Sequence, residues 1–530
     1  MSLTHAPVRA LGGVVASAHP LASSAGAEML QAGGTAFDAV VATAATLNVV
    51  EPFMSGLAGL GAATFWDASE RRVRCLDFIP PVPAGFDPTR VSRDSIAAGP
   101  MASGVPGNLA GWCALHETRG SLPLARVLEP AIRHARNGFP LSALYCQYAT
   151  ETAPRASGAE WQRVYWPTGS EPRQEEILRQ PDLASTLEAI AADGPGHLYG
   201  GPLGSAMVAH LGQHGGCLSM QDLVAVRPEF EDPLSADYRG LVAHVPPPPS
   251  EAFQFLLTLR ILDGFDLGAL EHLGTDHLDT VFRSIRLAAE TRILNNNRSL
   301  AEIEALLGES AVATLRNRVS DPRPVDGRTE QFGDAPPPEV AEARGHTTSM
   351  SVADRFGNMV CITQSLGSAW GSTVVIPGTG VCMNNFMNWG DLSPASPNYL
   401  IGGRRWAMCL SPVICTRDGQ ATLAIGTPGS YGIMQTQAQA MVHHVDFGLN
   451  IREAIEAPRA RLFDGRHVVV ENRIRDAVIA ALGDRGHEVE RAEAGFTALC
   501  GGMQAVMRDP ATGALLGTAD PRRDGSAVGI

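Results

Sequence analysis

Apolar residues recur with two different periods along the chain, and segments of the two kinds follow one another. A helical period, with apolar residues three and four positions apart, covers 25–31, 36–50, 124–137 and 252–262. A short apolar run bounded by glycines and charged residues predicts a strand over 62–66. No segment repeats at a fixed interval. This alternation of helices and short strands predicts an α/β protein made of one large unit or of two closely packed units.

The clearest change of character lies near residue 340. From 321 to 345 the chain is polar and rich in proline, a composition that buries too little apolar surface to order itself, so we expect an exposed linker. Directly after it, 347–354 alternates small polar with apolar residues, and 359–365 alternates again after a short turn. This pattern predicts a β-hairpin whose first strand begins with a hydroxyl residue, Thr347.

The composition is that of a globular protein with an acidic surface. Hydrophobic residues make up 45% and charged residues 18% of the 530 positions, which excludes a disordered or fibrous protein. There are 55 acidic against 41 basic residues, a net charge of −14, without a basic stripe, so we expect no nucleic-acid partner. No apolar stretch reaches the roughly 18 residues of a membrane span. We expect no membrane partner, no signal peptide in the short apolar stretch 11–18, and a cytoplasmic location.

Several kinds of site are disfavoured by single residue types. All the basic residues are arginines, which removes the P-loop lysine and every lysine nucleophile. The nine cysteines include no C-x-x-C pair, which is typical of reduced, buried thiols. The pair His443-His444 has no further metal-binding residue at the spacing of a metal site. The glycine-rich stretch 55–61 precedes a strand, whereas a phosphate-binding loop would follow a strand. We interpret both as structural, and we expect no metal and no organic cofactor.

A cut in the backbone before Thr347 would make this residue a candidate catalytic nucleophile. A threonine hydroxyl is a poor nucleophile at neutral pH and needs a base within hydrogen-bonding distance. The α-amine that cleavage would create on the same residue, with an unperturbed pKa of about 7.7–8.0, is such a base. The alternative is that Thr347 and Thr348 are ordinary β-branched strand residues, and the local pattern alone favours this alternative.

Ordered segments along nearly the whole chain resemble the γ-glutamyltranspeptidase family of N-terminal nucleophile hydrolases. The segments are 33–39 (GGTAFDA), 103–107 (SGVPG), 246–250 (PPPPS), the hairpin at 347, 378–385 (GTGVCMNN), 426–430 (GTPGS) and 519–522 (ADPR). The resemblance implies a four-layer αββα sandwich, made as a proenzyme that cleaves itself between His346 and Thr347. It implies a large chain, 1–346, ending in the exposed linker 321–346, and a small chain, 347–530, which remain together as one unit.

The resemblance also implies roles for single residues. The nucleophile of the family falls on Thr347, and its neighbour Thr348 would support it at the border of the substrate pocket. Ser365 falls where the family has a hydroxyl residue that hydrogen-bonds the nucleophile and aids self-cleavage. The oxyanion hole falls on the backbone N–H groups of Gly429 and Ser430, which would stabilise the charge of a tetrahedral intermediate. Serine in place of a second glycine need not change that role, because the donor is the backbone.

The sequence departs from the family where the substrate is held. Positions that pair the α-carboxylate and the α-amino group of a glutamyl substrate are here apolar or too small: Ile79, Gly367, Phe386, Trp389, Met408 and Cys409. Burying a zwitterionic head beside them would leave two charges unpaired. Arg404 and Arg405 are the remaining candidates for one substrate carboxylate, and a purely structural Arg405 is the alternative.

We therefore expect an N-terminal threonine hydrolase that cleaves an amide bond of a small molecule through an acyl-enzyme on Thr347, with an acyl group other than γ-glutamyl. In its rebuilt pocket it is similar to oxamate amidohydrolase and cephalosporin acylases. Three alternatives stay open: a glutathione hydrolase or γ-glutamyltransferase with an unconventional pocket, a carbon–carbon bond hydrolase of a natural-product pathway, and a non-catalytic binding protein on the same fold. Assembly of several two-chain units is also left open.

Overall fold

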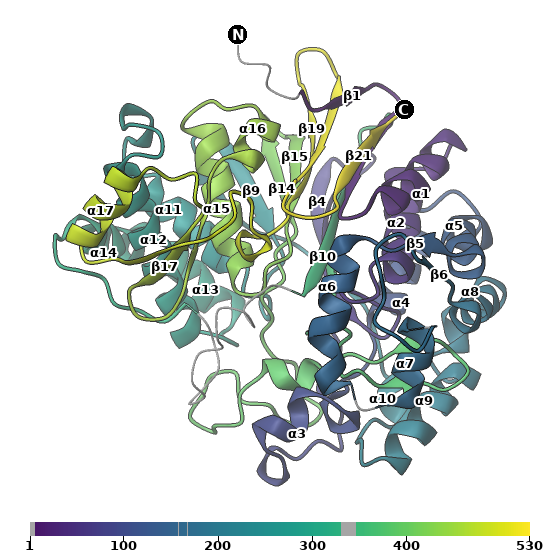
Figure 1. Cartoon of the computed structure of the whole chain (residues 1–530). Coiled ribbons are helices and arrows are strands. Elements are labelled where there is room, and N and C mark those ends of the chain that lie inside the picture. Colours follow the sequence, from purple (N-terminus) through teal and green to yellow (C-terminus); the bar gives the residue numbers. More distant parts are fainter. Residues whose placement is uncertain (1–5, 157, 167, 330–345) are drawn as a thin grey trace.

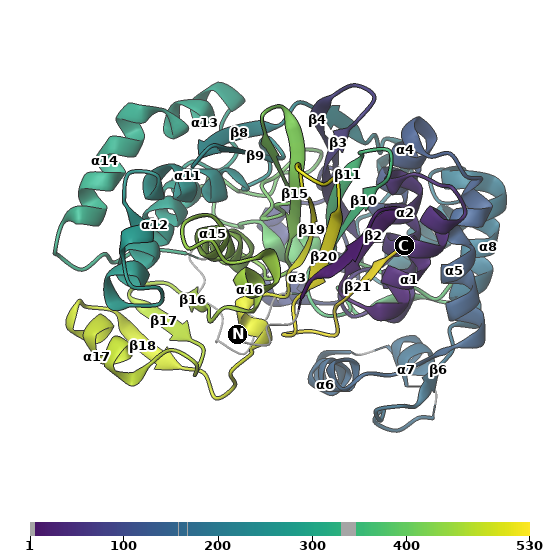
Figure 2. The same cartoon turned by 90° about the horizontal axis from the view of Figure 1, so that it is seen from above.

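Two seven-stranded sheets lie face to face, with helices on both outer faces, in the computed structural model (Figures 1 and 2). The structure describes residues 6–156, 158–166, 168–329 and 346–530. The view from above separates the four layers, with the sheets in the middle and one group of helices on each side (Figure 2). This arrangement is the αββα sandwich that the family resemblance implies.

The predicted hairpin lies at the centre of one sheet, which we call the hairpin sheet. Its strands, in spatial order, are β21 (Ser526–Gly529), β2 (Gly13–Ser17), β10 (Thr347–Asp354), β11 (Met359–Ser365), β3 (Leu60–Asp67), β4 (Arg72–Phe78) and β7 (Glu229–Glu231). Every neighbouring pair is antiparallel. All residues of β10 and β11 are buried, because helices cover one face of this sheet and the other sheet covers the opposite face.

The second sheet faces the hairpin sheet. Its strands, in spatial order, are β1 (Val8–Ala10), β20 (Leu515–Ala519), β19 (Gln504–Arg508), β15 (Gln420–Gly426), β14 (Val413–Arg417), β9 (Leu241–Val245) and β8 (Leu234–Tyr238). Small and branched apolar residues fill the space between the sheets, among them Ala16, Ala353, Ala424 and Val506. Small side chains allow the two sheets to pack closely.

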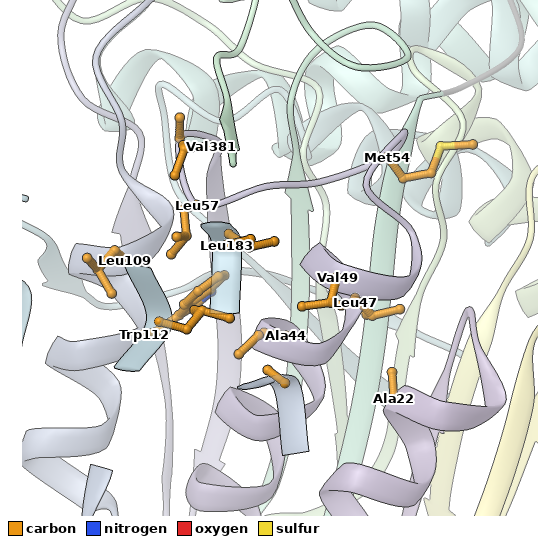
Figure 3. Packing of buried hydrophobic residues seen from close by; sticks show 14 of the residues in the cluster. Ala22, Ala44, Leu47, Val49, Met54, Leu57, Leu109, Trp112, Leu183 and Val381 are labelled. Carbon is orange, nitrogen blue, oxygen red and sulfur yellow. The ribbon is translucent and has the colours of Figure 1, made fainter. Parts of the chain in front are cut away.

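The outer face of the hairpin sheet is covered by α1 (Pro20–Gln31), α2 (Ala36–Val50) and α4 (Asn108–Arg119), with α5 (Leu124–Asn137) and α8 (Pro181–Asp193) farther out. Every residue of α2 is buried between the sheet and these helices. Figure 3 shows its side chain Ala44 near Trp112 of α4, and Leu47 and Val49 belong to the same cluster. The Trp112 indole N–H donates to Gln364 Oε1 of β11 over 2.9 Å, so α4 is also tied to the hairpin.

The outer face of the second sheet is covered by α11 (Phe253–Leu262), α12 (Thr275–Leu294), α14 (Glu309–Ser320) and α15 (Gly432–Val445). Smaller helices lie around these layers: α3 (Arg93–Ala97), α6 (Ala143–Thr152), α7 (Ala159–Tyr165), α9 (Pro202–Gln213), α10 (Met220–Val224), α13 (Leu300–Leu307), α16 (Ile451–Glu456) and α17 (Asp476–Asp484). The described residues also form three small sheets: β5 (Phe139–Pro140) with β6 (Ile177–Leu178), β12 (Val375–Ile376) with β13 (Val381–Cys382), and β16 (Ala460–Leu462) with β17 (His467–Val470) and β18 (Glu488–Arg491).

The predicted elements agree closely with those observed. The helices over 36–50 and 124–137 and both strands of the hairpin have the predicted bounds. Three elements differ at their ends: α1 begins at Pro20, α11 begins at Phe253, and β3 extends to Leu60 and Asp67. All nine cysteines lie in the described residues and are free thiols, as predicted. No helix among the described residues is long and apolar enough to cross a membrane.

The predicted linker is only partly described. Most of 321–329 is exposed or half-buried, but Thr329 is fully buried. Its N–H donates to Asp464 Oδ1 over 2.7 Å, and its backbone O accepts from Arg292 over 2.8 Å. The described part of this segment is therefore anchored at Thr329, which hydrogen-bonds the buried Arg292 and the half-buried Asp464. The rest of the predicted linker, 330–345, lies outside the described residues.

Candidate active site

Pairing of β10 with β11 brings together two hydroxyl side chains that the sequence singled out. Thr347 and Ser365 lie directly opposite each other in the antiparallel register, so their side chains share one face of the sheet. Thr347 Oγ1 donates to Ser365 Oγ over 3.3 Å, and both side chains are buried.

Ser365 also contacts the peptide group that precedes Thr347. Its hydroxyl donates to the backbone O of His346 over 2.7 Å and accepts from the backbone N–H of Gly367 over 2.9 Å. The Gly367 donor orients the hydroxyl so that its proton points at the His346 carbonyl. A donor in this position stabilises negative charge on that oxygen when a nucleophile attacks the carbonyl carbon.

The glycine-rich turn before β3 approaches this end of β11 closely. A Cβ atom at Gly59 would overlap the backbone O of Ser365, and one at Gly61 would lie 2.7 Å from the backbone O of Thr363. The turn therefore serves close packing, as predicted, and it fixes the strand end that carries Ser365.

The predicted oxyanion loop, 427–431, follows β15 in the facing sheet. A Cβ atom at Gly426 would lie 3.0 Å from Ser349 Cβ, whereas Ala424 lies with Ala353 in the cluster between the sheets. β15 therefore runs toward the start of β10 and carries the loop toward Thr347.

Gly429 and Ser430 both have a positive φ, +142° and +56°. In the described part of the chain, neither backbone N–H has a hydrogen-bond acceptor, so both donors are available. Arg461 fixes the loop by donating to the backbone O of Gly429 over 3.2 Å. The left-handed conformation costs Ser430 about 1–2 kcal/mol, and strain of this kind is found most often at functional sites.

Four predicted pocket residues gather in one apolar cluster. Ile79, Phe386 and Met408 are buried members of it, and Trp389 lies at its edge. Leu60, which pairs with Ser365 across β11 and β3, belongs to the same cluster. The apolar cluster is therefore next to the hydroxyl pair.

Trp389 connects this cluster to the other parts of the site. A Cβ atom at Gly367 would come within 3.0 Å of the Trp389 indole nitrogen, so the absence of a side chain there makes room for the ring. The ring centre also lies 6.0 Å from that of Tyr431, the residue after Ser430. Gly367 and Trp389 thus lie between the hydroxyl pair and the oxyanion loop.

Two of the predicted pocket residues lie elsewhere. Thr348 is fully buried, and its hydroxyl donates to Glu51 of α2, on the face of β10 opposite Thr347. Cys409 packs in the cluster between the second sheet and its helices, whereas its neighbour Met408 faces Ile79 and Phe386. In both cases the reason is the same, since successive side chains of an extended chain point to opposite sides.

Arg405 is already engaged by protein carboxylates. Its guanidinium forms ion pairs with Asp77 and with Glu229, the second over 3.1 Å. Asp77 also accepts from the N–H of Ile79 over 2.7 Å, so the carboxylate fixes both residues. This arrangement favours the structural interpretation of Arg405. Arg404 is exposed, and together with Arg405 it lines a surface pocket of about 410 Å³.

Two charged residues that the sequence analysis did not single out lie beside the start of β10. Glu51 ends α2 and accepts from Thr348 over 2.7 Å. Arg523 donates to the backbone O of Thr347 over 3.0 Å. Burial raises the pKa of Glu51 to about 7, against the opposing effects of Arg523 and of the Thr348 hydrogen bond. The signal in the sequence was a lone carboxylate directly after fifteen residues of apolar helix.

Both residues of the histidine pair contact neighbouring groups of the protein. His443 is buried in α15 with its ring nitrogen 2.9 Å from that of His272, and His444 contacts the backbone O of Leu449 at 2.7 Å. Burial lowers the pKa of His443, so its ring is neutral at pH 7. Across the described ranges, no group of three His, Cys, Asp or Glu side chains is arranged to hold a metal ion.

Comparisons with known proteins agree with this geometry. Residues 22–530 match the family model described as gamma-glutamyltranspeptidase. The chain is 34% identical to the acylase ACY 1 proenzyme of Pseudomonas sp. (strain SE83), over 99% of this chain and 94% of that protein. It is 32% identical to the glutathione hydrolase-like YwrD proenzyme of Bacillus subtilis (strain 168), over 98% of each. The structure of a cephalosporin acylase from Bacillus halodurans is similar, with a TM-score of 0.90 and 29% identity over 100% of this chain and 98% of that one.

The fold and the hairpin site together define an N-terminal nucleophile hydrolase, an enzyme that acts on amide bonds. The chain belongs to the gamma-glutamyltranspeptidase family. Like the relatives named as proenzymes, it is an autoprocessing member of this class.

Proposed function

We propose that this enzyme cleaves its chain between His346 and Thr347 and then uses Thr347 as the nucleophile of an amide hydrolase. The observation that supports the proposal is the hydrogen-bonded row of Thr347 Oγ1, Ser365 Oγ and His346 O. It joins the nucleophile, a hydroxyl partner and the carbonyl to be attacked.

In the cleavage step, Thr347 Oγ1 attacks the carbonyl carbon of His346 while Ser365 donates to the carbonyl oxygen. The bond between His346 C and Thr347 N breaks as that nitrogen takes up the hydroxyl proton, which leaves an ester on the Thr347 side chain. Water then hydrolyses the ester to a His346 carboxylate and a free Thr347 α-amine. The net change is the addition of one water molecule.

In the substrate reaction, the neutral α-amine takes the proton from Thr347 Oγ1, and the oxygen attacks the amide carbonyl of the substrate. The N–H groups of Gly429 and Ser430 would stabilise the oxyanion. The amine product leaves with the proton, and water hydrolyses the acyl ester. Because the base must be unprotonated, kcat/KM rises with pH through the apparent pKa of the amine.

The acyl group we propose lacks an α-ammonium group. Ile79, Phe386 and Met408 form an apolar surface beside the hydroxyl pair, and Arg405 is paired with Asp77 and Glu229. A glutamyl head would therefore bring two charges next to these apolar side chains, which offer no partner for either charge. Short aliphatic or aromatic acyl groups fit the apolar cluster better.

The first test is the cleavage itself. The pieces 1–346 and 347–530 should appear on a denaturing gel as bands of about 36 and 19 kDa from the 55.9-kDa chain, taking residue mass as uniform. Thr347→Ala should give a single full-length band, whereas Thr347→Ser keeps an oxygen nucleophile and should cleave slowly. N-terminal sequencing of the smaller piece should begin at Thr347. A wild-type enzyme that stays intact while hydrolysing an amide would contradict the proposed base.

The second test is substrate competition at equal concentration. γ-Glutamyl-p-nitroanilide competes with the p-nitroanilides of glutaric, oxalic and simple aliphatic acids. Each missing charge-assisted hydrogen bond costs about 1.5–3 kcal/mol, so two together should lower kcat/KM for the glutamyl compound roughly a hundredfold. A clear preference for the glutamyl compound would instead favour a glutathione hydrolase whose clamp comes from other residues.

A further inference from the structure

Glu51 occupies a position that is unfavourable for a carboxylate. It is fully buried, and it ends α2, where the negative end of the helix dipole lies. Within the described residues, its Oε1 atom has no hydrogen-bond partner, while Oε2 accepts from Thr348 over 2.7 Å. A buried carboxyl with only one of its oxygens bonded is a poor stabiliser, so its presence calls for another role.

Two charges that act on Glu51 come from one segment, the residues just before β21. Arg523 attracts the carboxylate, and Asp524 repels it. The same Arg523 guanidinium donates to the backbone O of Thr347 over 3.0 Å. The first two residues of β10 are thus held by an opposite pair of charges, Thr347 by the arginine and Thr348 by the carboxyl group.

We propose that Glu51 is a positioning residue for the nucleophile: acting through Thr348, it holds the start of β10 and favours the protonated form of the α-amine created at Thr347. This inference rests on the proposed function. Cleavage places a cation next to a residue whose side chain Glu51 already binds, and that cation favours the ionised carboxyl group in turn. Arg523 acts in the opposite direction, because a second cation disfavours the ammonium form. The two side chains together set the pH at which the amine becomes a base.

The experiment measures kcat/KM of the cleaved enzyme from about pH 5 to 10, with the p-nitroanilide that the wild type hydrolyses fastest. Glu51→Gln keeps an oxygen acceptor for Thr348 but removes the charge, so the midpoint of the rise should fall by about one pH unit. Arg523→Gln should raise the midpoint by a similar amount, and Arg523→Lys, which keeps the charge, should restore it.

The matched control is Glu231→Gln on the edge strand β7 of the same sheet. Burial raises the pKa of Glu231 to about 7 as well, and its Oε2 atom also lacks a partner among the described residues. Because β7 lies at the edge of the sheet, away from β10, this variant should keep the wild-type midpoint. A general effect of removing a carboxyl group with a raised pKa would move both profiles equally.

The inference is overturned if cleaved, active Glu51→Gln has the wild-type midpoint, or if Glu51→Gln and Arg523→Gln shift it in the same direction. If Glu51→Gln does not cleave itself, the Arg523 variants decide: an upward shift in Arg523→Gln supports the inference, and an unmoved midpoint overturns it. Failure of the proposed function has a different signature, since Thr347→Ala would then still cleave or remain active.

Discussion

Ser365 makes three contacts through one oxygen, with Thr347 Oγ1, His346 O and the Gly367 N–H. Removing the hydroxyl leaves the His346 carbonyl without this donor when negative charge develops on it. We predict that Ser365→Ala slows self-cleavage by about 100-fold, the usual effect of losing one oxyanion donor. The loss of full-length protein with time on a denaturing gel measures this rate.

Ser351→Ala is the matched control for this prediction. Ser351 is a buried hydroxyl residue on the same face of β10 as Thr347, and it donates to the backbone O of Gln504 over 3.2 Å. We expect this variant to cleave at nearly the wild-type rate. Equal slowing of both variants would indicate a general weakening of the hairpin in place of a specific role for Ser365.

Among the elements, Asp354 is one of the residues that join the hairpin to the central helix α2. Asp354, the last residue of β10, accepts from the N–H of Ala36 at the start of α2 over 2.8 Å. It also accepts two backbone N–H groups of the hairpin turn, from Phe356 and Asn358, each over 2.9 Å. Since hydrogen bonds to a buried charged group contribute about 1.5–3 kcal/mol each, Asp354→Ala should destabilise the fold by about 3 kcal/mol or more.

Thermal unfolding in the uncleaved Thr347→Ala background measures this effect on a single chain. Asp232→Ala removes an exposed carboxylate 3.6 Å from Arg74 and should change the stability by no more than about 0.5 kcal/mol. Equal melting temperatures of the two variants would show that Asp354 does not join the hairpin to the helix.

The sequence predicted these elements well where the signal is local. The hairpin bounds follow from strict alternation and turn residues between 354 and 359, and 36–50 ends at the Glu51-Pro52 boundary. The contact between Glu51 and Thr348 joins residues 297 positions apart and leaves no local pattern. The ion pair of Arg405 with Asp77 leaves no local pattern in the sequence either, and neither does the direction in which the Cys409 side chain points. Family resemblance located the chemistry, but only the packing of distant segments shows which partners each residue has.

For the whole molecule, strands from the two sides of residue 346 alternate within both sheets. β10 and β11 lie between β2 and β3 in one sheet, and β20, β19, β15 and β14 lie between β1 and β9 in the other, so β1 and β2 pair only with strands that follow residue 346. We predict that the two cleaved chains elute together in size-exclusion chromatography under native conditions. Separation into two peaks should require a denaturant, and separate elution in plain buffer would contradict the strand order described here.

Because the strands of the two parts are interleaved, the chain folds more readily before the cut than after it. Before the cut, the covalent link keeps the two parts at a high effective concentration, so each sheet assembles within one molecule. After the cut, the unfolded large and small parts must find each other by diffusion, and each exposes strand edges that pair readily with the wrong partner. The mature enzyme is therefore stable for a kinetic reason as well as a thermodynamic one: its recovery from denaturant should depend on protein concentration, whereas that of the uncleavable precursor should not.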